Sequence, residues 1–302
     1  MKIGIIGLGK MGGGVAERLV NAGYTVIGYD PSESARTQAS EYGIQLAADV
    51  ATVACAVEIV WLFVPAGDPV DNVLNILVQH MHTGAIIIDG GNSNFHDSIT
   101  RAKRCAQHNL FFVDCGTSGG LAGRTHGYSL MIGGDLHAYE RIVPLLTAIS
   151  APHGFGYMGP SGTGHYVKMV HNGIEYGIMQ AYAEGLHLLK EGTFKDVPLD
   201  LATICRVWQH GALLRSYFLD LVHDIVRNDQ QLTDISGEIF EGGTGRWTVN
   251  EAHAHKVPVP VIEASLDVRT WSRTTGGNYA TKLIARIRHA FGGHAVKKKD
   301  HA

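Results

Sequence analysis

The chain has 302 residues, of which 45% are hydrophobic and 18% are charged, and its formal net charge is −3. This balance excludes intrinsic disorder, and it provides no basic field that would attract nucleic acid. Four cysteines lie far apart without a CxxC pair, and no apolar run is long enough to cross a membrane. We therefore expect a soluble, cytoplasmic protein of two domains, with reduced thiols and with neither nucleic acid nor a membrane as partner.

Short apolar runs alternate with helical patterns in the first half of the chain. These runs are Lys2–Gly7, Thr25–Asp30, Val57–Pro65, Ala85–Gly91, Leu110–Gly116 and Ser129–Gly134. Because they are continuously apolar, most of the strands should be parallel and covered by helices on both faces. The expected fold class is α/β, beginning with a doubly wound, Rossmann-type domain.

The composition changes at Gly156–Gly164, a stretch rich in glycine that also contains proline and that we interpret as a loop. Helical patterns follow over residues 165–192, about 199–228, around 249–255, and from 261 to the tail. We predict a dinucleotide-binding domain over residues 1–163. An all-α substrate and oligomerisation domain with a C-terminal tail should follow over residues 164–302.

The segment GLGKMG fits the pattern G-x-G-x-x-G and lies between a predicted strand and a predicted helix. Its glycines let backbone N–H groups and the start of the helix approach a pyrophosphate closely. The cofactor-binding residues predicted here are Gly7, Leu8, Gly9, Lys10, Met11 and Gly12.

Asp30 ends the second predicted strand, 18 residues after Gly12. A carboxylate there can accept hydrogen bonds from both adenosine ribose hydroxyls, and it would repel a 2′-phosphate. We therefore predict that NAD is preferred over NADP. Two alternatives stay open, namely that Asp30 caps a helix before Pro31, or that Arg36 reaches a 2′-phosphate.

The helical segment His165–Gln180 has an unusual polar stripe. At 100° per residue, one face carries Lys168, His171, Asn172, Glu175 and Tyr176, and a second, apolar face carries Val167, Val170, Ile174 and Ile178. A partly desolvated lysine can act as a general base and a glutamate as an acid. The alternative is a surface ion pair, against which the histidine, the asparagine and two helix glycines count.

This segment, HYVKMVHNGIEYGIMQ, resembles the signature of the 6-phosphogluconate dehydrogenase family of the β-hydroxyacid dehydrogenase superfamily. Ile86–Ser93, Gly116–Gly120 and Gly243–Thr248 match the family in the same order, and the length resembles the short bacterial form. The resemblance implies oxidative decarboxylation of 6-phospho-D-gluconate to D-ribulose 5-phosphate and CO2, in the pentose phosphate pathway, without a metal. It implies Lys168 as the general base at the C3 hydroxyl and Glu175 as the acid that protonates C1.

The resemblance also implies the remaining site residues. Those implied for the sugar acid are Asn92, Ser118, Gly119, Gly120, His171, Asn172, Tyr176 and Arg269, the last two for its phosphate; Val64, Pro65 and Asn92 are implied for the cofactor. One departure concerns a phosphate contact, because the lysine that many members have before the GTG motif is here Gly242. Arg246 could compensate for it.

The tail carries Arg288, Phe291, Gly292 and His294 in the family's R-x-x-F-G-x-H spacing. In the family this segment enters the active site of the neighbouring subunit. We therefore expect a homodimer or a dimer of dimers, in which Arg288 binds substrate phosphate and His294 binds a sugar hydroxyl, both in trans.

Other functions are compatible with parts of the sequence. A β-hydroxyacid dehydrogenase of the 3-hydroxyisobutyrate type would use the same nucleotide domain and a similar lysine on an unphosphorylated acid. A non-catalytic NAD-binding sensor is a further alternative. The 17 histidines include no HExxH motif and no acidic ligand cluster, so we expect no metal site.

Overall fold

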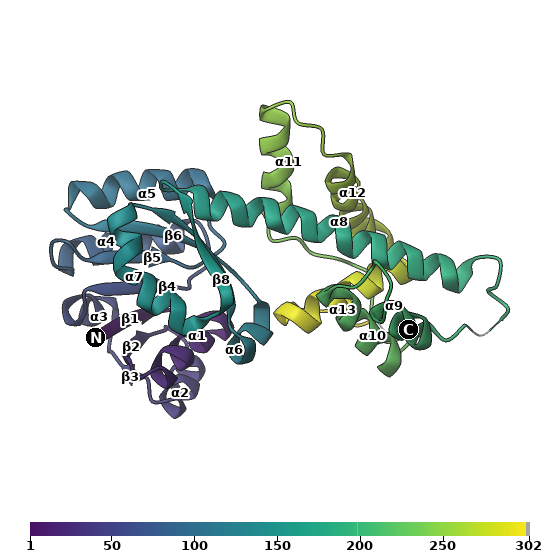
Figure 1. Ribbon diagram of the computed structural model, residues 1–302, viewed down its shortest axis with the longest axis horizontal. Coiled ribbons are helices and arrows are strands. Elements are labelled where there is room, and N and C mark those ends of the chain that lie inside the picture. The colour runs from purple at the N-terminus through teal and green to yellow at the C-terminus, as the bar shows by residue number, and fades with distance from the viewer. Residues whose placement is uncertain (198, 300–302) are drawn as a thin grey trace. The chain divides into compact units, whose positions relative to one another are not determined.

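The computed structural model describes residues 1–197 and 199–299, so the last three residues of the predicted second domain lie outside the described part (Figure 1). The chain forms two compact units, Met1–Met169 and Val170–Ala302. The predicted boundary at residue 163 coincides with the start of helix α8 (Thr163–Glu191). The division between the two compact units falls later, after Met169, because the first turns of this helix pack within the first unit.

The first unit is built on an eight-stranded sheet of order β3-β2-β1-β4-β5-β6-β7-β8. Its strands are β1 (Lys2–Ile6), β2 (Thr25–Tyr29), β3 (Gln45–Leu46), β4 (Ile59–Leu62), β5 (Ile86–Asp89), β6 (Phe111–Ser118), β7 (Tyr128–Gly134) and β8 (Ser150–Gly159). All neighbours are parallel except β6 and β7. The predicted α/β fold with a mainly parallel sheet is confirmed.

The loop interpretation of Gly156–Gly164 is wrong for its first residues, which belong to β8. Phe155 and Tyr157 alternate along this strand and pair with Leu130 and Ile132 of β7. The glycines between them obscured the alternation in the sequence, although an edge strand tolerates glycine. The short strand β3 was also not predicted.

Alternate residues of the central strands pack on opposite faces of the sheet. In β5, Ile86 and Ile88 join one buried core, whereas Ile87 joins the other. Figure 1 shows helices on both faces. These helices are α1 (Lys10–Asn21), α2 (Glu33–Glu41), α3 (Val50–Ala56), α4 (Asp68–His80), α5 (Phe95–Gln107), α6 (Gly123–His126) and α7 (Leu136–Ile149), with a 3-10 turn at Gly120–Ala122. The strands are therefore covered on both sides, as their continuous hydrophobicity requires.

The second unit is helical, as predicted, with its own buried core. After α8 come α9 (Leu201–Gln209), α10 (Tyr217–Asn228), α11 (Thr244–Ala254), α12 (Pro260–Thr275) and α13 (Tyr279–Gly292). Two helical patterns of the sequence are each divided into two helices. Gly276 and Gly277 take left-handed φ values of 79° and 71° and end α12, and Asn278 then begins α13 with a capping box. Ser216 likewise caps a separate α10.

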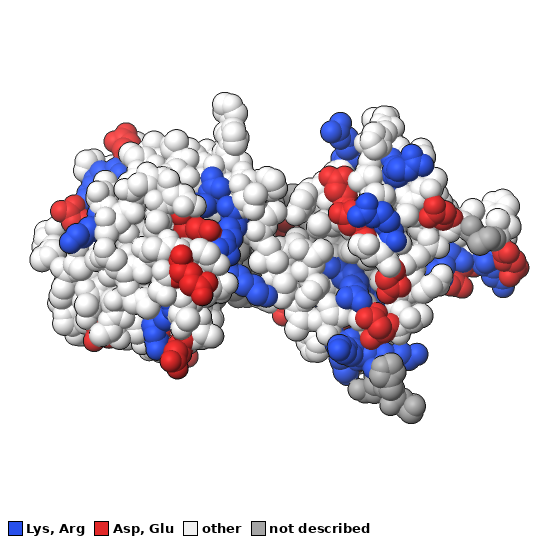
Figure 2. All heavy atoms as spheres, turned by 90° about the horizontal axis from the view of Figure 1, so that it is seen from below, with Lys and Arg blue, Asp and Glu red and all other residues white. Residues whose placement is uncertain are grey.

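In the described part of the chain no helix is long and apolar enough to cross a membrane. The face seen in Figure 2 carries Lys and Arg side chains beside Asp and Glu side chains on each unit. This mixture agrees with the formal net charge of −3.

Candidate active site

The glycine loop between β1 and α1 has the form that a dinucleotide phosphate needs. Gly7 has a φ of 93°, and a Cβ on it would lie 2.3 Å from the carbonyl oxygen of Phe63. A Cβ on Gly12 would lie 1.9 Å from the carbonyl oxygen of Gly7, whereas Gly9 faces open space. No side chain caps α1 and its first turn has no acidic residue. The start of α1, at the positive end of the helix dipole, therefore suits an anion.

Asp30 follows β2 and its carboxylate is directed at this loop. One oxygen accepts the N–H of Leu8 at 2.8 Å and the other accepts the N–H of Ser32 at 2.8 Å. The N-cap of α2 is Ser32, whose side chain accepts the N–H of Ala35, so the alternative that Asp30 caps this helix is wrong. The Arg36 guanidinium donates to the carbonyl oxygens of Asp30 and Pro31, at 2.6 and 3.1 Å.

The loops after β4, β5 and β6 leave the same edge of the sheet, because these three strands are parallel neighbours. Val64 and Pro65 follow β4, and Asn92 is exposed after β5. The two loops are close together, since a Cβ on Gly91 would lie 3.1 Å from the carbonyl oxygen of Val64. Ser118 ends β6 at the same edge. The left-handed Gly119 and Gly120 turn the chain after it.

Lys168 lies against β6 in the same unit. A Cβ on Gly116 would come within 2.4 Å of the Lys168 Cβ, so only glycine lets the helix approach the strand this closely. The start of α8 is fixed by the fully buried Asp114, whose carboxylate oxygens accept the N–H groups of Gly162 at 2.6 Å and of His165 at 2.9 Å. The predicted base therefore lies beside the strand that ends at Ser118.

The His165 ring adds a second contact to this anchor. Its Nδ1 lies 2.7 Å from the hydroxyl of Ser98 on α5, and the ring is 2% exposed. Two helices of the first unit thus share a buried hydrogen bond. Together with Asp114 it fixes the turn of α8 that directly precedes Lys168.

Three residues of the polar stripe of α8 are buried and much of the apolar face is exposed, the reverse of what a helix in a single folded chain normally shows. The side chains of His171 and Glu175 are partly exposed, at 36% and 23%. The exposed fractions are 7% for Lys168, 9% for Asn172 and 7% for Tyr176. On the apolar face they are 36% for Val167, 52% for Ile174 and 38% for Ile178. His171 Nδ1 lies 3.7 Å from Glu175 Oε1 and 3.3 Å from Asn172 Oδ1. The burial of Lys168 therefore does not fit a solvated ion-pair surface, whereas His171 and Glu175 form a partly exposed pair.

Tyr176 lies in an arginine cluster of the second unit. The guanidinium carbon of Arg269 is 3.3 Å from the centre of its ring. Arg269 is fully buried, and none of its three guanidinium nitrogens has a hydrogen-bond partner in the described residues. Burial, with a smaller effect of the nearby Arg288, lowers the pKa of Arg269 to about 10, against the raising effects of Tyr176 and Glu241. Burial also lowers the pKa of Arg288, which is 9% exposed.

Two buried cations that interact with each other, one of them with unused N–H donors, are the chemistry of an anion site. Sequence reasoning did not find that the cluster includes a carboxylate. Glu241 interacts with both arginines, and it lies 3.8 Å from Arg246 and 3.9 Å from Arg273. Arg246 is thus near the cluster, as the compensation hypothesis requires. A Cβ on Gly242 would meet nothing within 4 Å, so no steric constraint explains the glycine.

The tail packs on its own unit in this single chain. The ring of Phe291 contacts Phe218 at 6.0 Å and His294 at 5.8 Å between centroids. The carbonyl oxygen of His294 lies 2.9 Å from Nδ1 of His289. Arg288 interacts with Arg269 of the same chain. Since one chain is described, the exchange of tails stays a prediction.

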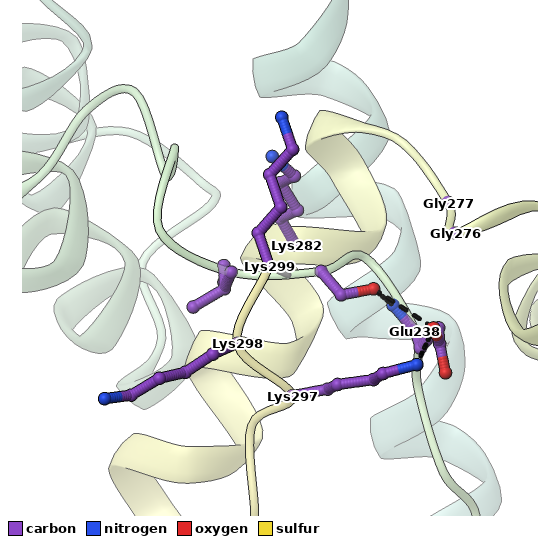
Figure 3. A pocket seen from close by; sticks show the side chains of 9 residues that line it. Glu238, Gly276, Gly277, Lys282, Lys297, Lys298 and Lys299 are labelled. Carbon is purple, nitrogen blue, oxygen red and sulfur yellow. Dashed lines mark hydrogen bonds and ion pairs between the residues drawn. The ribbon is translucent and has the colours of Figure 1, made fainter. Parts of the chain in front are cut away.

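The lysine run at the end of the tail is bound to the second unit. Lys297 and Lys299 form main-chain hydrogen bonds with Ser236 and Asp234, and the Lys297 ammonium donates to Glu238 at 2.7 Å. Figure 3 shows these lysines around a hollow of about 420 Å³. It is lined by Ile235, Ser236, Glu238, Gly276, Gly277, Lys282, Lys297, Lys298 and Lys299, none of which is a predicted site residue. The run is therefore not a free solvated end.

Over residues 1–197 and 199–299 no three His, Cys, Asp or Glu side chains are grouped as metal ligands. Two charged residues that support the site were missed from the sequence, Asp114 and Arg101. Asp114 had a visible signal, because it is a lone acid inside the apolar run Leu110–Gly116. Arg101 had none, since its helix carries several basic residues.

The fold and the placement of Lys168 define a dinucleotide-dependent dehydrogenase with a Rossmann-type unit and a helical unit. A family model for the NAD binding domain of 6-phosphogluconate dehydrogenase matches residues 2–172, and one for the C-terminal domain of 6-phosphogluconate dehydrogenase matches residues 164–302. An NAD(+)-dependent, decarboxylating 6-phosphogluconate dehydrogenase from Haloferax volcanii is 43% identical over 99% of this chain and 100% of its own length. The chain belongs to the 6-phosphogluconate dehydrogenase family.

Solved structures agree with this assignment. The chain is similar to 6-phosphogluconate dehydrogenase from Plasmodium falciparum, at 32% identity and a TM-score of 0.80 over 90% of this chain. It spans 62% of that longer protein. It also shares its fold with 3-hydroxyisobutyrate dehydrogenase from Salmonella typhimurium, at 23% identity and a TM-score of 0.79 over 94% of this chain and 99% of the other.

Because Arg269 is buried without hydrogen-bond partners in the described residues, we predict that it lowers the stability of the empty protein while it favours the binding of phosphate. Arg269→Met removes a buried, unpaired cation and keeps much of its volume. We expect the free energy of unfolding without ligand to rise by about 1–4 kcal/mol, and the stabilisation of the wild type by added phosphate to disappear. Urea unfolding with and without phosphate measures both. Arg273→Met is the matched control, because Arg273 already donates to the carbonyl oxygen of Ile239. A less stable Arg269→Met protein would contradict the argument.

Proposed function

We propose that this chain converts 6-phospho-D-gluconate and NAD to D-ribulose 5-phosphate, CO2 and NADH. The observation that carries the proposal is the arginine cluster on Tyr176, two turns along α8 from Lys168. A single helix thereby carries a buried lysine and, at a fixed spacing, an aromatic residue that contacts the buried Arg269 and interacts electrostatically with the buried Arg288. A substrate with a phosphate at one end and a β-hydroxy acid at the other matches this order of groups.

The cofactor is supported by the loop Gly7–Gly12 and by Asp30. The open backbone at Gly9 and the uncapped start of α1 fit a pyrophosphate, and the Asp30 carboxylate fits the adenosine ribose. Arg36 would have to give up its two carbonyl acceptors to reach a 2′-phosphate. Bound NAD supplies the acceptor for the hydrogen at C3.

Lys168 is the proposed general base. It takes the proton of the C3 hydroxyl as C3 is oxidised, which requires that it begin the reaction uncharged; burial favours the uncharged amine. Once C3 is a ketone, the C1 carboxylate leaves as CO2, because the β-carbonyl accepts the electron pair. The protonated Lys168 then stabilises the developing enolate oxygen.

Glu175 is the proposed acid that protonates C1 of the enediol to give ribulose 5-phosphate. It lies two turns from Lys168 on the same face, with His171 close to its carboxylate. His171 and Asn172 would orient the reacting end. Asn92, Ser118, Gly119 and Gly120 would bind the carboxylate and hydroxyls of the sugar acid, and Tyr176 and Arg269 would bind its phosphate.

A 3-hydroxyisobutyrate-type reaction is the second candidate, because the fold is shared with such enzymes. It is disfavoured because an unphosphorylated acid leaves two buried arginines, Arg269 and Arg288, with Glu241 as their shared carboxylate and leaves the guanidinium nitrogens of Arg269 without a hydrogen-bond partner in the described residues. A sensor without catalysis is disfavoured because it would have no use for a lysine and a glutamate two turns apart.

The exposed apolar face of α8 supports a homo-oligomer, since Ile174 at 52% exposure would otherwise contact water. For the tail we propose the family's exchange, in which Arg288 binds substrate phosphate in the site of the neighbouring subunit. Its proximity to Arg269 within one chain makes service to its own site the alternative that the refolding experiment tests. His294, which is exposed, stays the proposed ligand of a sugar hydroxyl.

Lys168→Ala should abolish CO2 release from 6-phosphogluconate, with a loss on the order of 10²–10⁴ in rate from the missing base. NAD should still bind, because the nucleotide loop is separate from α8. The matched variant Glu175→Gln should instead impair protonation of the enediol, measured by tritium exchange at C1 of ribulose 5-phosphate. Retention of most activity in Lys168→Ala would remove Lys168 from its role, and a wild type that releases no CO2 would overturn the proposed function.

Initial rates with both cofactors should give a kcat/KM for NAD that is about tenfold or more above that for NADP, because the 2′-phosphate meets the Asp30 carboxylate. Asp30→Ser keeps a short oxygen acceptor but removes the negative charge. This variant should reduce the ratio of kcat/KM for NAD to kcat/KM for NADP. Comparable or better rates of the wild type with NADP would show that Arg36 overrides Asp30.

Refolding Lys168→Ala together with Arg288→Ala tests the tail. If Arg288 serves its own chain, no mixed dimer contains an intact site and no activity returns. If the tail is exchanged, one site of each mixed dimer is intact, and random pairing recovers about a quarter of wild-type activity. Mass measurement must confirm the mixed dimers. The control is the wild type refolded together with the double variant Lys168→Ala/Arg288→Ala. It measures how much activity is lost through refolding itself.

A further inference from the structure

Arg101 lies on α5 and forms the most complete charge pair of the first unit. Its Nε and Nη2 donate to the two carboxylate oxygens of Asp71, at 2.9 and 2.8 Å. Nη2 also donates to the carbonyl oxygen of Gly67 at 3.0 Å. The side chain is 3% exposed, and Asp97 lies at the limit of an ion pair, 4.0 Å away. A planar fork with this many contacts has a fixed position.

The opposite side of the guanidinium faces the loop that carries Asn92. Nη1 of Arg101 lies 3.7 Å from Oδ2 of Asp89, which is fully buried at the end of β5. Asp89 in turn accepts the hydroxyl of Ser93 at 2.7 Å and the N–H of Gly91 at 3.1 Å. Asn92 is therefore flanked on both sides by residues that the Asp89 carboxylate holds.

Gly67 belongs to the other loop of this edge, and Asp71 lies in the first turn of α4, which follows that loop. Gly67 is two residues after Pro65, has a φ of 86°, and precedes the first turn of α4. One guanidinium thus contacts the segment after β4, which carries Val64 and Pro65, and the carboxylate that organises the loop after β5.

The two carboxylates depend on Arg101 to different degrees. Asp71 has a side chain 44% exposed, so water can solvate it if the arginine is removed. Asp89 is fully buried, and among the described residues its only ion-pair partner is Arg101. Removing Arg101 therefore leaves a buried carboxylate without a counter-ion, which is strongly unfavourable. The strain falls on the loop of Asn92.

We propose that Arg101 is a positioning residue for the reaction. It fixes the loop of Asn92 against the loop of Val64 and Pro65. The acid end of the substrate and the nicotinamide end of the cofactor are then held at a fixed distance and orientation to each other. This inference rests on the proposed function for the roles of Asn92, Val64 and Pro65. Arg101 itself, being buried under the loops, contacts neither ligand.

The first test compares Arg101→Met and Arg101→Lys with Arg104→Met. Arg104 lies one turn further along α5 and also contacts α4, through Asn75, but touches neither loop. We expect kcat/KM for 6-phosphogluconate to fall about 100-fold in Arg101→Met, as for a displacement of about 1 Å at a reacting centre. Arg101→Lys should recover part of the loss, and Arg104→Met should stay near wild type. The Kd of NAD should change less than threefold, because the loop Gly7–Gly12 is untouched.

The second test separates positioning from general stability. Asp71→Asn should lower the unfolding midpoint with little loss of kcat, whereas Asp89→Asn should lower kcat. Adding Asp89→Asn to Arg101→Met removes the unpaired charge and should restore part of the activity lost by Arg101→Met; adding Asp71→Asn should not. If activity follows the unfolding midpoint across all these variants, Arg101 is only structural and the proposal is overturned.

A third measurement does not depend on the substrate. Hydrogen exchange followed by mass spectrometry should show faster exchange over residues 89–94 in Arg101→Met, but not in Arg104→Met or over residues 7–12. If exchange over residues 89–94 is unchanged, the proposal is overturned whatever the kinetics. A wild type that releases no CO2 from 6-phosphogluconate would overturn the proposed function instead, while this measurement would still decide whether Arg101 fixes the loop.

Discussion

The arrangement of the site depends on one buried carboxylate, Asp114 in β6. It accepts two N–H groups from the start of α8, at Gly162 and His165, and so satisfies two of the four donors that a helix leaves unpaired. Its charge also lies at the positive end of the helix dipole. Because Gly116 follows two residues later in the same strand and contacts Lys168, a single strand fixes both the axis of the helix and the place of its lysine.

The anchor also explains why α8 can present its polar stripe inward. A helix held only by hydrophobic burial would turn Ile174 and Ile178 toward the core and Lys168 toward water. Here the N-terminus is fixed by hydrogen bonds in the first unit, and Tyr176 is fixed by contact with Arg269 and by the close approach of Gly245 in the second. The apolar residues Val167, Ile174 and Ile178 stay exposed on the other face of this helix.

The periodicity of the sequence predicted most of the fold, since continuous apolar runs and the glycine loop depend on local pattern alone. It failed where tertiary contacts override that pattern. The strand β8 was missed because its register comes from pairing with β7. The helix break at Gly276 had a visible signal in the Gly-Gly pair, and the break before α10 had one in its cap residue Ser216. For the site, the stripe on α8 and Asp30 followed from spacing. The contact of Arg101 with Asp89 and Gly67 could not, because it joins three segments that have no shared pattern in the sequence.

Arg101 and Arg269 show how an arginine that organises the structure differs from one that awaits a ligand. Both are almost fully buried, so both have lost their water. Arg101 replaces it with a bidentate carboxylate and a carbonyl oxygen, which makes its charge part of the fold. Arg269 replaces it only with the face of Tyr176, and its pKa falls to about 10 through burial. Such a group lowers the stability of the empty protein and regains that free energy when an anion binds. The number of satisfied N–H donors, rather than burial or charge, is what distinguishes the two roles.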